Sequence, residues 1–359
     1  MRNPAIAGGW TLRAVPALPV PALFALAILA LGILVVAIGL AVSIGEMAIP
    51  LGTIAKAVGN RLLGTGFTIS PIQEGIIWDY RLSRSLAAAC CGAALAMSGA
   101  ILQALLRNPL AEPYVLGISA GASTGAVAVM IAGLGGGALS MSGGAFTGAI
   151  IAFTLVCALA AGTGGLTGTG AERIILAGVA GSQLFSALTS YIVTTSANAE
   201  QARGVMFWLL GSLGGIRWPD VGLAAPVAIG GFAIAILHAR ALDAFAFGVD
   251  AAVALGIPVT RVRLILFGLT AAMTATMVSI VGSVGFVGLV VPHAARFLVG
   301  PGHMRLLPVS FMIGAVFMVL ADIVSRIVVP QQILPIGVVT ALFGAPAFAF
   351  ILYKARRRL

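Results

Sequence analysis

The chain has 359 residues, of which 60 % are hydrophobic and only 8 % are charged, whereas a soluble domain carries about 25 % charged residues. This composition excludes a soluble enzyme, a secreted disulfide scaffold and a nucleic-acid-binding protein, and it indicates an integral membrane protein. The net charge of +10 fits a multi-span protein whose Lys and Arg residues collect in cytoplasmic loops.

The predicted fold is an all-α polytopic membrane protein, because the apolar runs are continuous and do not alternate as in a β-barrel. A crossing needs about 20 apolar residues, so the chain predicts about ten transmembrane helices in one domain over residues 1–359. Run 113–171 holds two spans with a break near Gly135, and run 264–295 holds one span and the start of a second. The uncharged runs lie at 14–45, 85–106, 113–171, 174–199, 221–239, 264–295 and 327–353, with a further span at 306–325.

The orientation follows from the distribution of Lys and Arg. Ten spans place both termini on one side, and the larger share of the 20 basic residues falls on that side, so we expect both termini in the cytoplasm (N-in/C-in). The expected cytoplasmic segments are a tail at 1–17, a loop at 241–260 and a basic tail at 354–359.

Small residues recur every four positions in two predicted helices. Such residues let helices approach closely in lipid, and hydroxyl groups can bond across the contact. One stripe favours packing and comprises Gly92, Ala96 and Ala100. The other favours either packing or a smooth, weakly polar wall along a substrate path, and comprises Gly178, Ser182, Ser186 and Ser190.

Two segments are too short to span but too apolar for free loops. Residues 204–216 include Trp208 and predict a helix at the outer interface, where Trp prefers to lie. Residues 284–299 predict a short span that begins at a Gly-rich turn and is kinked at Pro292.

The loop at 241–260 predicts a short helix. We expect Asp250 to cap a helix over 251–255, Gly256 to take the left-handed position after it, and Pro258 to prevent its continuation. The apolar face of this helix either packs under its own bundle or docks into the groove of a partner.

The motifs of catalysis are missing from the sequence. Neither lysine lies in a phosphate-binding glycine loop, the three histidines do not cluster with other metal ligands, and no Ser-His-Asp set can be assembled. The sequence therefore indicates no enzyme, no metal site and no cofactor. Asp322 is the acidic residue that comes nearest to lying inside a span, and Arg326 four residues later predicts a helical ion pair. The shortage of deep carboxylates argues against an ion-coupled secondary transporter, which stays the alternative.

Several long strings, in this order, resemble the permeases of the iron-chelate and cobalamin uptake ABC importers, the type II class. The resemblance runs from about residue 20 to the C-terminus. The strings are RLSR at 81–84, CGAALAMSGAILQALLRNPLAEPYVLGISAGAS at 91–123, FWLLGSLGG at 207–215, VALGIP at 253–258, GFVGLVVPHAAR at 285–296 and LPIGVVTALFGAPAF at 334–348.

The resemblance implies a ten-helix permease that acts as a homodimer in the bacterial inner membrane. Two ATP-binding cassette subunits lie beneath it and hydrolyse ATP, and a periplasmic substrate-binding protein docks above. Substrate passes along the dimer axis. The expected substrate is a ferric siderophore, followed by haem and then cobalamin.

The resemblance also assigns residues. It implies that Arg81, Arg84 and Arg326 dock the binding protein, although lipid phosphates or the pair with Asp322 also explain them. It places one cytoplasmic gate at Asn108 and Leu110. A second gate falls at Ala171 and Glu172, where the cobalamin member has a pair of small hydroxyl residues. The stripe from Gly178 to Ser190 would line the path. ATPase coupling falls on Asp250, Ala251, Ala254, Leu255, Gly256, Ile257 and Pro258.

Overall fold

The structure is a computed structural model that describes residues 20–45, 47–132, 138–162 and 171–356. Every regular element in these ranges is a helix, so the all-α prediction is confirmed. The long apolar helices are α1 (Val20–Ser43), α4 (Ser83–Leu105), α6 (Ala138–Gly162), α7 (Ala171–Ser196), α9 (Trp218–Leu237), α12 (Val259–Val281), α14 (His303–Ile327) and α15 (Ile336–Arg356), and two shorter ones are α5 (Ile118–Ala132) and α13 (Val287–Val299).

Short helices connect these elements. A π-helix at Ile76–Leu82 leads directly into α4, and a single 3₁₀ turn at Pro113–Leu116 precedes α5. The remaining helices are α2 (Leu51–Leu63), α3 (Pro71–Gly75), α8 (Ala199–Leu209), α10 (Ala239–Ala246) and α11 (Val249–Ala254). The helix predicted over 204–216 is present only over 204–209, as the second half of α8, and it ends at Leu209 because Gly211 takes a positive φ of 75°. Its position at the interface stays a prediction.

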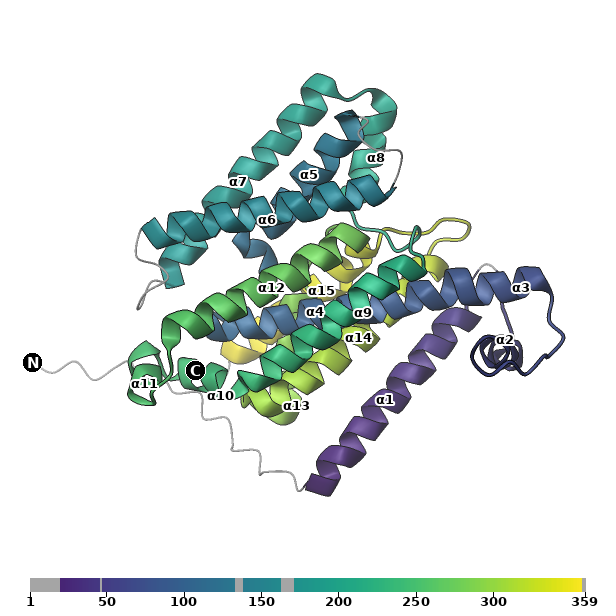
Figure 1. The fold of residues 1–359 in the computed structure, drawn as a ribbon, viewed down its shortest axis with the longest axis horizontal. Helices are drawn as coiled ribbons and strands as arrows, with labels where there is room; N and C mark the ends of the chain where they lie inside the picture. The colour runs from purple at the N-terminus through teal and green to yellow at the C-terminus, as the bar shows by residue number, and fades with distance from the viewer. Residues whose placement is uncertain (1–19, 46, 133–137, 163–170, 357–359) are drawn as a thin grey trace, which may run out of the picture.

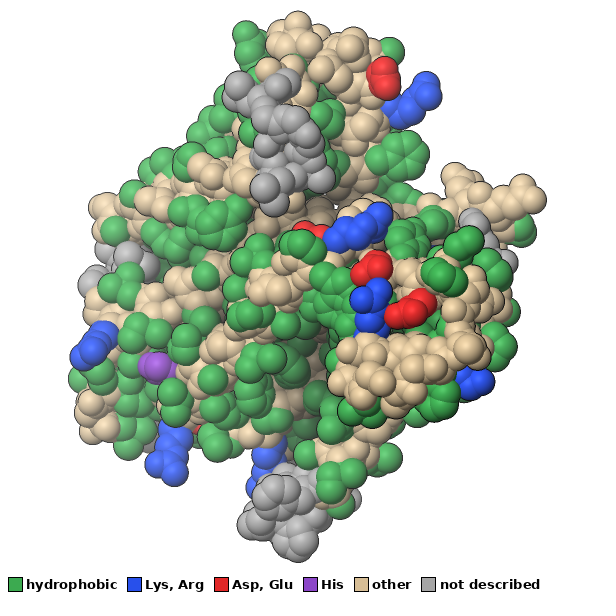
Figure 2. Space-filling model, turned by 45° about the vertical axis from the view of Figure 1, so that its right-hand side comes forward, with side chains coloured by type: hydrophobic (Ala, Val, Ile, Leu, Met, Phe, Trp, Pro, Cys, Tyr) green, Lys and Arg blue, Asp and Glu red, His purple; other side chains and the backbone are tan. Residues whose placement is uncertain are grey.

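The bundle is built around α4 (Figure 1). Helices α9, α12, α13 and α14 pack against α4, and α1 packs against α14. Helices α5, α6 and α7 pack on one another as a second group. Figure 1 shows α10 and α11 at one end of the bundle, called the α11 end, and α2 and α3 at the opposite end, called the α2 end. Figure 2 brings the α2 end forward and shows a few charged side chains gathered amid a hydrophobic surface.

Glycines allow α4 to lie against its neighbours backbone to backbone. A Cβ added at Gly92 would overlap the Gly314 carbonyl of α14, and one added at Gly99 would overlap the Gly288 carbonyl of α13. Ala96 and Ala100 are completely buried. The stripe Gly92, Ala96 and Ala100 therefore packs helices, as expected.

Six helices in the described ranges are long and apolar enough to cross a membrane, and four shorter apolar helices accompany them. The count of ten crossings and the orientation stay predictions. The predicted tail at 1–17, the break near Gly135 and the last three residues of the basic tail lie outside the described residues.

Candidate functional site

Two of the three predicted docking arginines, Arg84 and Arg326, pair with one buried carboxylate at the α2 end. Arg84 donates from Nε to Oδ1 of Asp322 at 2.8 Å, and its Nη2 lies 2.7 Å from the same oxygen. Arg326 Nη2 lies 3.1 Å from Oδ2, so the predicted pair of Asp322 and Arg326 is confirmed. The pair with Arg84 joins residues 238 positions apart and was not predicted.

Two of the three arginines, Arg81 and Arg326, cap the end of α1. Arg81 donates to the carbonyls of Val42 and Met47 at 2.8 and 2.6 Å. Arg326 donates to those of Ile44 and Ala41 at 2.8 and 2.9 Å. The last carbonyls of a helix have no partner within it, and an unsatisfied carbonyl is costly away from water. These bonds give Arg81 and Arg326 a structural role at this end of the bundle.

Burial bears on the predicted docking role of the cluster. Arg81 and Arg84 are 7 % and 2 % exposed, and Asp322 is fully buried. The structure brings the three arginines together, but it holds two of them inside the protomer. Docking of a binding protein therefore stays a prediction.

The predicted first gate lies in a tight turn after α4. The helix ends with Arg107 in the left-handed conformation (φ 48°), and the Asn108 N–H donates back to the Gln103 carbonyl at 3.2 Å. Asn108 Oδ1 accepts from the Leu110 N–H at 2.9 Å, an Asx-type turn. Leu110 is left 47 % exposed at the tip.

A cavity of about 390 Å³ at the α11 end brings two predicted site residues together. It contains Asn108 of the first gate, Glu172 of the second, and Val249 of the predicted coupling loop. Leu105, Leu106, Arg107, Ile175 and Arg263 complete its lining. Ala171 is the first residue of α7, and Leu110 lies outside the lining.

The predicted coupling helix exists as α11, with a correction at its start. The N-cap is Gly248, whose φ of 112° favours glycine, while Asp250 lies in the first turn. Gly256 takes the predicted left-handed conformation (φ 75°), and the Ile257 N–H donates to the Ala252 carbonyl at 3.1 Å.

This coupling helix is only partly buried. Ala252 is completely buried, so one side of the helix packs under its own bundle, whereas the apolar side chains around it face outward. Docking of this outward face into a partner stays a prediction. The exposed ones are Phe247 at 81 %, Leu255 at 71 % and Val253 at 58 %. Asp250, Ala254, Gly256 and Pro258 are exposed, and Ala251 and Ile257 are half-buried.

A hydrogen-bonded pair that the sequence did not predict joins this region to α14. Asp243 of α10 accepts from the backbone N–H of His303 at 2.8 Å and contacts its Nδ1 at 2.6 Å. Partial burial opposes ionisation, but these hydrogen bonds lower the pKa of the Asp243 carboxyl overall. A carboxylate also suits the first turn of α14, where helix N–H groups are free. The pair was missed because the two residues lie 60 positions apart.

The small-residue stripe on α7 passes from the protomer core to its surface. Gly178 is buried and Ser182 half-buried, while Ser186 and Ser190 are exposed. Their exposed apolar neighbours on α7 are Leu176, Val179, Leu184, Leu188 and Tyr191. The path-lining role stays a prediction, and half of the stripe lies where a partner or substrate could reach it.

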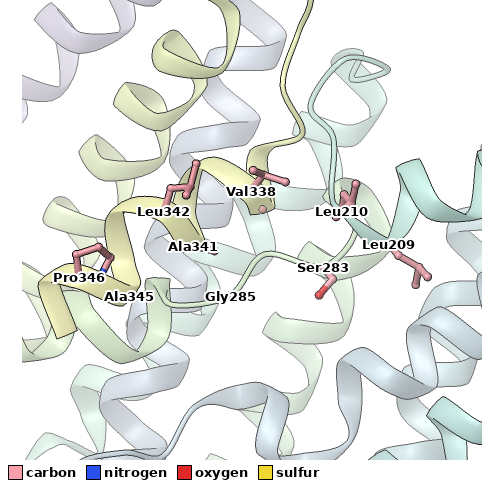
Figure 3. Close-up of a pocket in the computed structure, with 10 residues that line it drawn as sticks. Leu209, Leu210, Ser283, Gly285, Val338, Ala341, Leu342, Ala345 and Pro346 are labelled. Atoms are coloured by element: carbon pink, nitrogen blue, oxygen red, sulfur yellow. The ribbon is translucent and has the colours of Figure 1, made fainter. Parts of the chain in front are cut away.

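A second cavity, lined mostly by apolar residues, has a volume of about 570 Å³. Figure 3 shows Ala341, Leu342, Ala345 and Pro346 along α15, with Leu209 and Leu210 across the space and Ser283 and Gly285 on the connection that leads to α13. In the described ranges, no three His, Cys, Asp or Glu side chains gather as metal ligands.

A bundle of helices that are long and apolar enough to cross a membrane defines an integral membrane protein, and its similarity to known proteins gives its class. The chain matches the FecCD transport family over residues 33–354. It is 38 % identical over 330 residues to the cobalamin import system permease protein BtuC of Halobacterium salinarum, covering 86 % of each chain. It is 35 % identical to the uncharacterized ABC transporter permease protein YvrB of Bacillus subtilis, covering 93 % of this chain and 95 % of that one.

A solved structure supports the same assignment. An inward-facing ABC transporter assigned to the metal-chelate type superposes with a TM-score of 0.80 at 29 % identity, covering 92 % of this chain and 99 % of that one. The chain belongs to the FecCD transport family. It is an ABC transporter permease, a multi-pass protein of the inner membrane.

Proposed function

We propose that this permease imports a bulky metal chelate, as a homodimer that works with two ATP-binding cassette subunits and a periplasmic substrate-binding protein. The α11 end is then cytoplasmic, with both termini on that side of ten crossings. The observation that carries the proposal is that Asn108 and Glu172, one from each predicted gate, line one cavity at that end together with Val249 of the predicted coupling loop. ATP hydrolysis on a partner subunit supplies the energy.

Cobalamin is the first candidate substrate and a ferric siderophore the second, which moves cobalamin from third place in the order that the sequence favoured to first. The reason is the relatives, since proteins named for cobalamin or vitamin B12 import are 35–38 % identical over 85–86 % of this chain. The apolar lining of the larger cavity suits a large ligand that must pass without being retained. Glu172 in place of a small hydroxyl residue favours the siderophore.

The test is uptake into proteoliposomes that contain the permease, the ATPase subunit and the binding protein. Cobalamin, a ferric siderophore and haem are supplied separately, with and without internal ATP. ATP-dependent accumulation of one chelate is expected. Accumulation that follows an ion gradient without ATP would instead establish a secondary transporter.

The exposed coupling helix should be the ATPase contact. Ala254→Glu or Gly256→Arg places a bulky charge where small exposed residues stand, so we expect the ATPase subunit to dissociate while the membrane fold persists. The measurement is the amount of ATPase that copurifies with the permease. Lys56→Glu, an exposed change on α2, is the control. Copurification at the wild-type ratio from both coupling variants would contradict the contact.

The exposed Leu110 side chain should change its surroundings during transport. In a dimer, two copies would face each other across the axis at the inner mouth. Leu110→Cys is expected to cross-link between protomers in one nucleotide state and not in another, as judged by gel mobility. Cross-linking that ignores nucleotide would remove the gating role.

Docking at the α2 end is best tested without substitution, because Arg84 is already paired inside the protomer. If charge guides the binding protein to this end, its association rate with the nanodisc-embedded permease should fall as salt approaches 1 M, where the Debye length is about 3 Å. A rate that does not depend on salt would exclude electrostatic docking.

A further inference from the structure

Two chain reversals that are far apart in sequence lie against each other. Helices α5 and α13 each begin just after a residue with positive φ, Gly117 at 74° and Phe286 at 69°. Between these starts, Ser119 Oγ donates to Ser283 Oγ at 3.1 Å. Helices α5 and α13 have 15 and 13 residues, and a membrane crossing needs about 20. Because both helices are too short to cross, the connections that precede them reach into the bundle.

Two side chains hold the second connection to the first. Tyr114 Oη donates to the Val284 carbonyl and accepts from the Val284 N–H, both at 2.7 Å. Glu112 Oε1 accepts from the Phe286 N–H at 2.7 Å. Backbone groups inside a protein need partners, and these three bonds supply them along one short stretch.

The held segment, residues 283–286, has a different environment on each side. Ser283 and Gly285 form part of the wall of the 570 Å³ cavity. Val284 and Phe286 of the same segment are bonded to Tyr114 and Glu112, which share one short stretch of chain with Leu110. Pro109 and Pro113 fix two φ angles in that loop and stiffen it. The cavity wall and Leu110 are therefore joined through a short series of bonds and a stiff loop.

We propose that Glu112 and Tyr114 are positioning residues that make segment 283–286 and the loop 108–114 move as one body. Entry of the chelate into the apolar cavity then acts on the cytoplasmic gate through these two side chains. This inference rests on the proposed function and assigns the coupling within it to residues that sequence reasoning did not single out.

The first test removes the phenol hydroxyl. Tyr114→Phe is expected to lower chelate uptake per ATP hydrolysed about tenfold, because both bonds to Val284 are lost, while ATPase activity persists. In the same variant, cross-linking through Leu110→Cys should no longer follow nucleotide. Tyr80→Phe is the matched control, since phenylalanine keeps the ring that Arg217 contacts, and it should behave as wild type.

Conservative rescue separates positioning from simple packing. Glu112→Gln keeps an oxygen that accepts from the Phe286 N–H and should retain wild-type coupling, whereas Glu112→Ala should resemble Tyr114→Phe. Wild-type uptake per ATP in both Tyr114→Phe and Glu112→Ala would overturn the inference.

A disulfide provides the second test, which does not require the Tyr114 variant to fold. In a background lacking Cys90, Cys91 and Cys157, the pair Ser119→Cys/Ser283→Cys is oxidised. If the two connections move together, the oxidised protein should transport at least as fast as the same protein in its reduced form. Oxidation should also restore coupling in the Tyr114→Phe variant. Loss of uptake on oxidation would show that the connections must separate, and would overturn the inference. Absence of ATP-driven uptake by the wild type would instead overturn the proposed function.

Discussion

Replacing Asp322 with alanine should destabilise the folded protein by roughly 3–5 kcal/mol, because it leaves a buried guanidinium without its counter-charge. Asp322 is completely buried and bonded to Arg84, which is 2 % exposed, and to Arg326. The loss is measured as a fall in the midpoint of thermal unfolding in detergent, followed by size-exclusion chromatography.

The chain offers a matched control in an exposed ion pair. Arg61 and Glu74 lie 2.9 Å apart with side chains 50 % and 23 % exposed, so Glu74→Ala should cost at most about 1 kcal/mol. The double change Arg84→Met/Asp322→Leu should recover much of the stability, since an apolar pair carries no desolvation penalty. An Asp322→Ala protein as stable as the Glu74→Ala protein would refute the structural role of the cluster.

Valine at Gly92 should force α4 and α14 apart and cost about 3 kcal/mol, the upper part of the range for overpacking. Its Cβ would overlap a backbone carbonyl of Gly314, which no rotamer change can relieve. The expected result is a large loss of monodisperse protein in detergent and a lower unfolding temperature.

Gly230→Val is the matched control for this change. Gly230 lies within α9, as Gly92 lies within α4, but a Cβ there meets nothing within 4 Å. Valine is a slightly better helix former than glycine, so the control should be neutral or slightly stabilising. Equal behaviour of the two variants would mean that the helices are not in backbone contact at Gly92.

Local patterns predicted what local interactions determine. The uncharged runs predicted the apolar helices, the spacing from Asp322 to Arg326 predicted their ion pair, and Gly256 predicted the end of α11. The predicted start of α11 was wrong because glycine and aspartate are both common at the N-cap of a helix. The N-cap is Gly248 because the chain takes a positive φ there.

Contacts between segments that are far apart in the chain could not be predicted from the sequence. Nothing near Arg84 indicates that its partner lies 238 residues later, and nothing near Tyr114 indicates a bond to the backbone of Val284. Helices α2 and α3 were missed because their mixed composition gives no continuous apolar run. Such features follow from which helices pack together, and one sequence does not reveal that arrangement.

The cap on α1 has a consequence for the order in which the protein is made. Arg81 is synthesised soon after the carbonyls of Val42 and Met47 that it bonds, whereas Arg326 follows Ile44 by 282 residues. At about 5–20 residues per second, the ribosome needs roughly 15–55 s to cover that distance. Until Arg326 is made, Arg81 is the one residue of this arginine pair that can bond the end of the first helix. The cap on the first helix is therefore complete only when translation is nearly finished. A nascent chain that stops before Arg326 lacks the bonds to the carbonyls of Ile44 and Ala41.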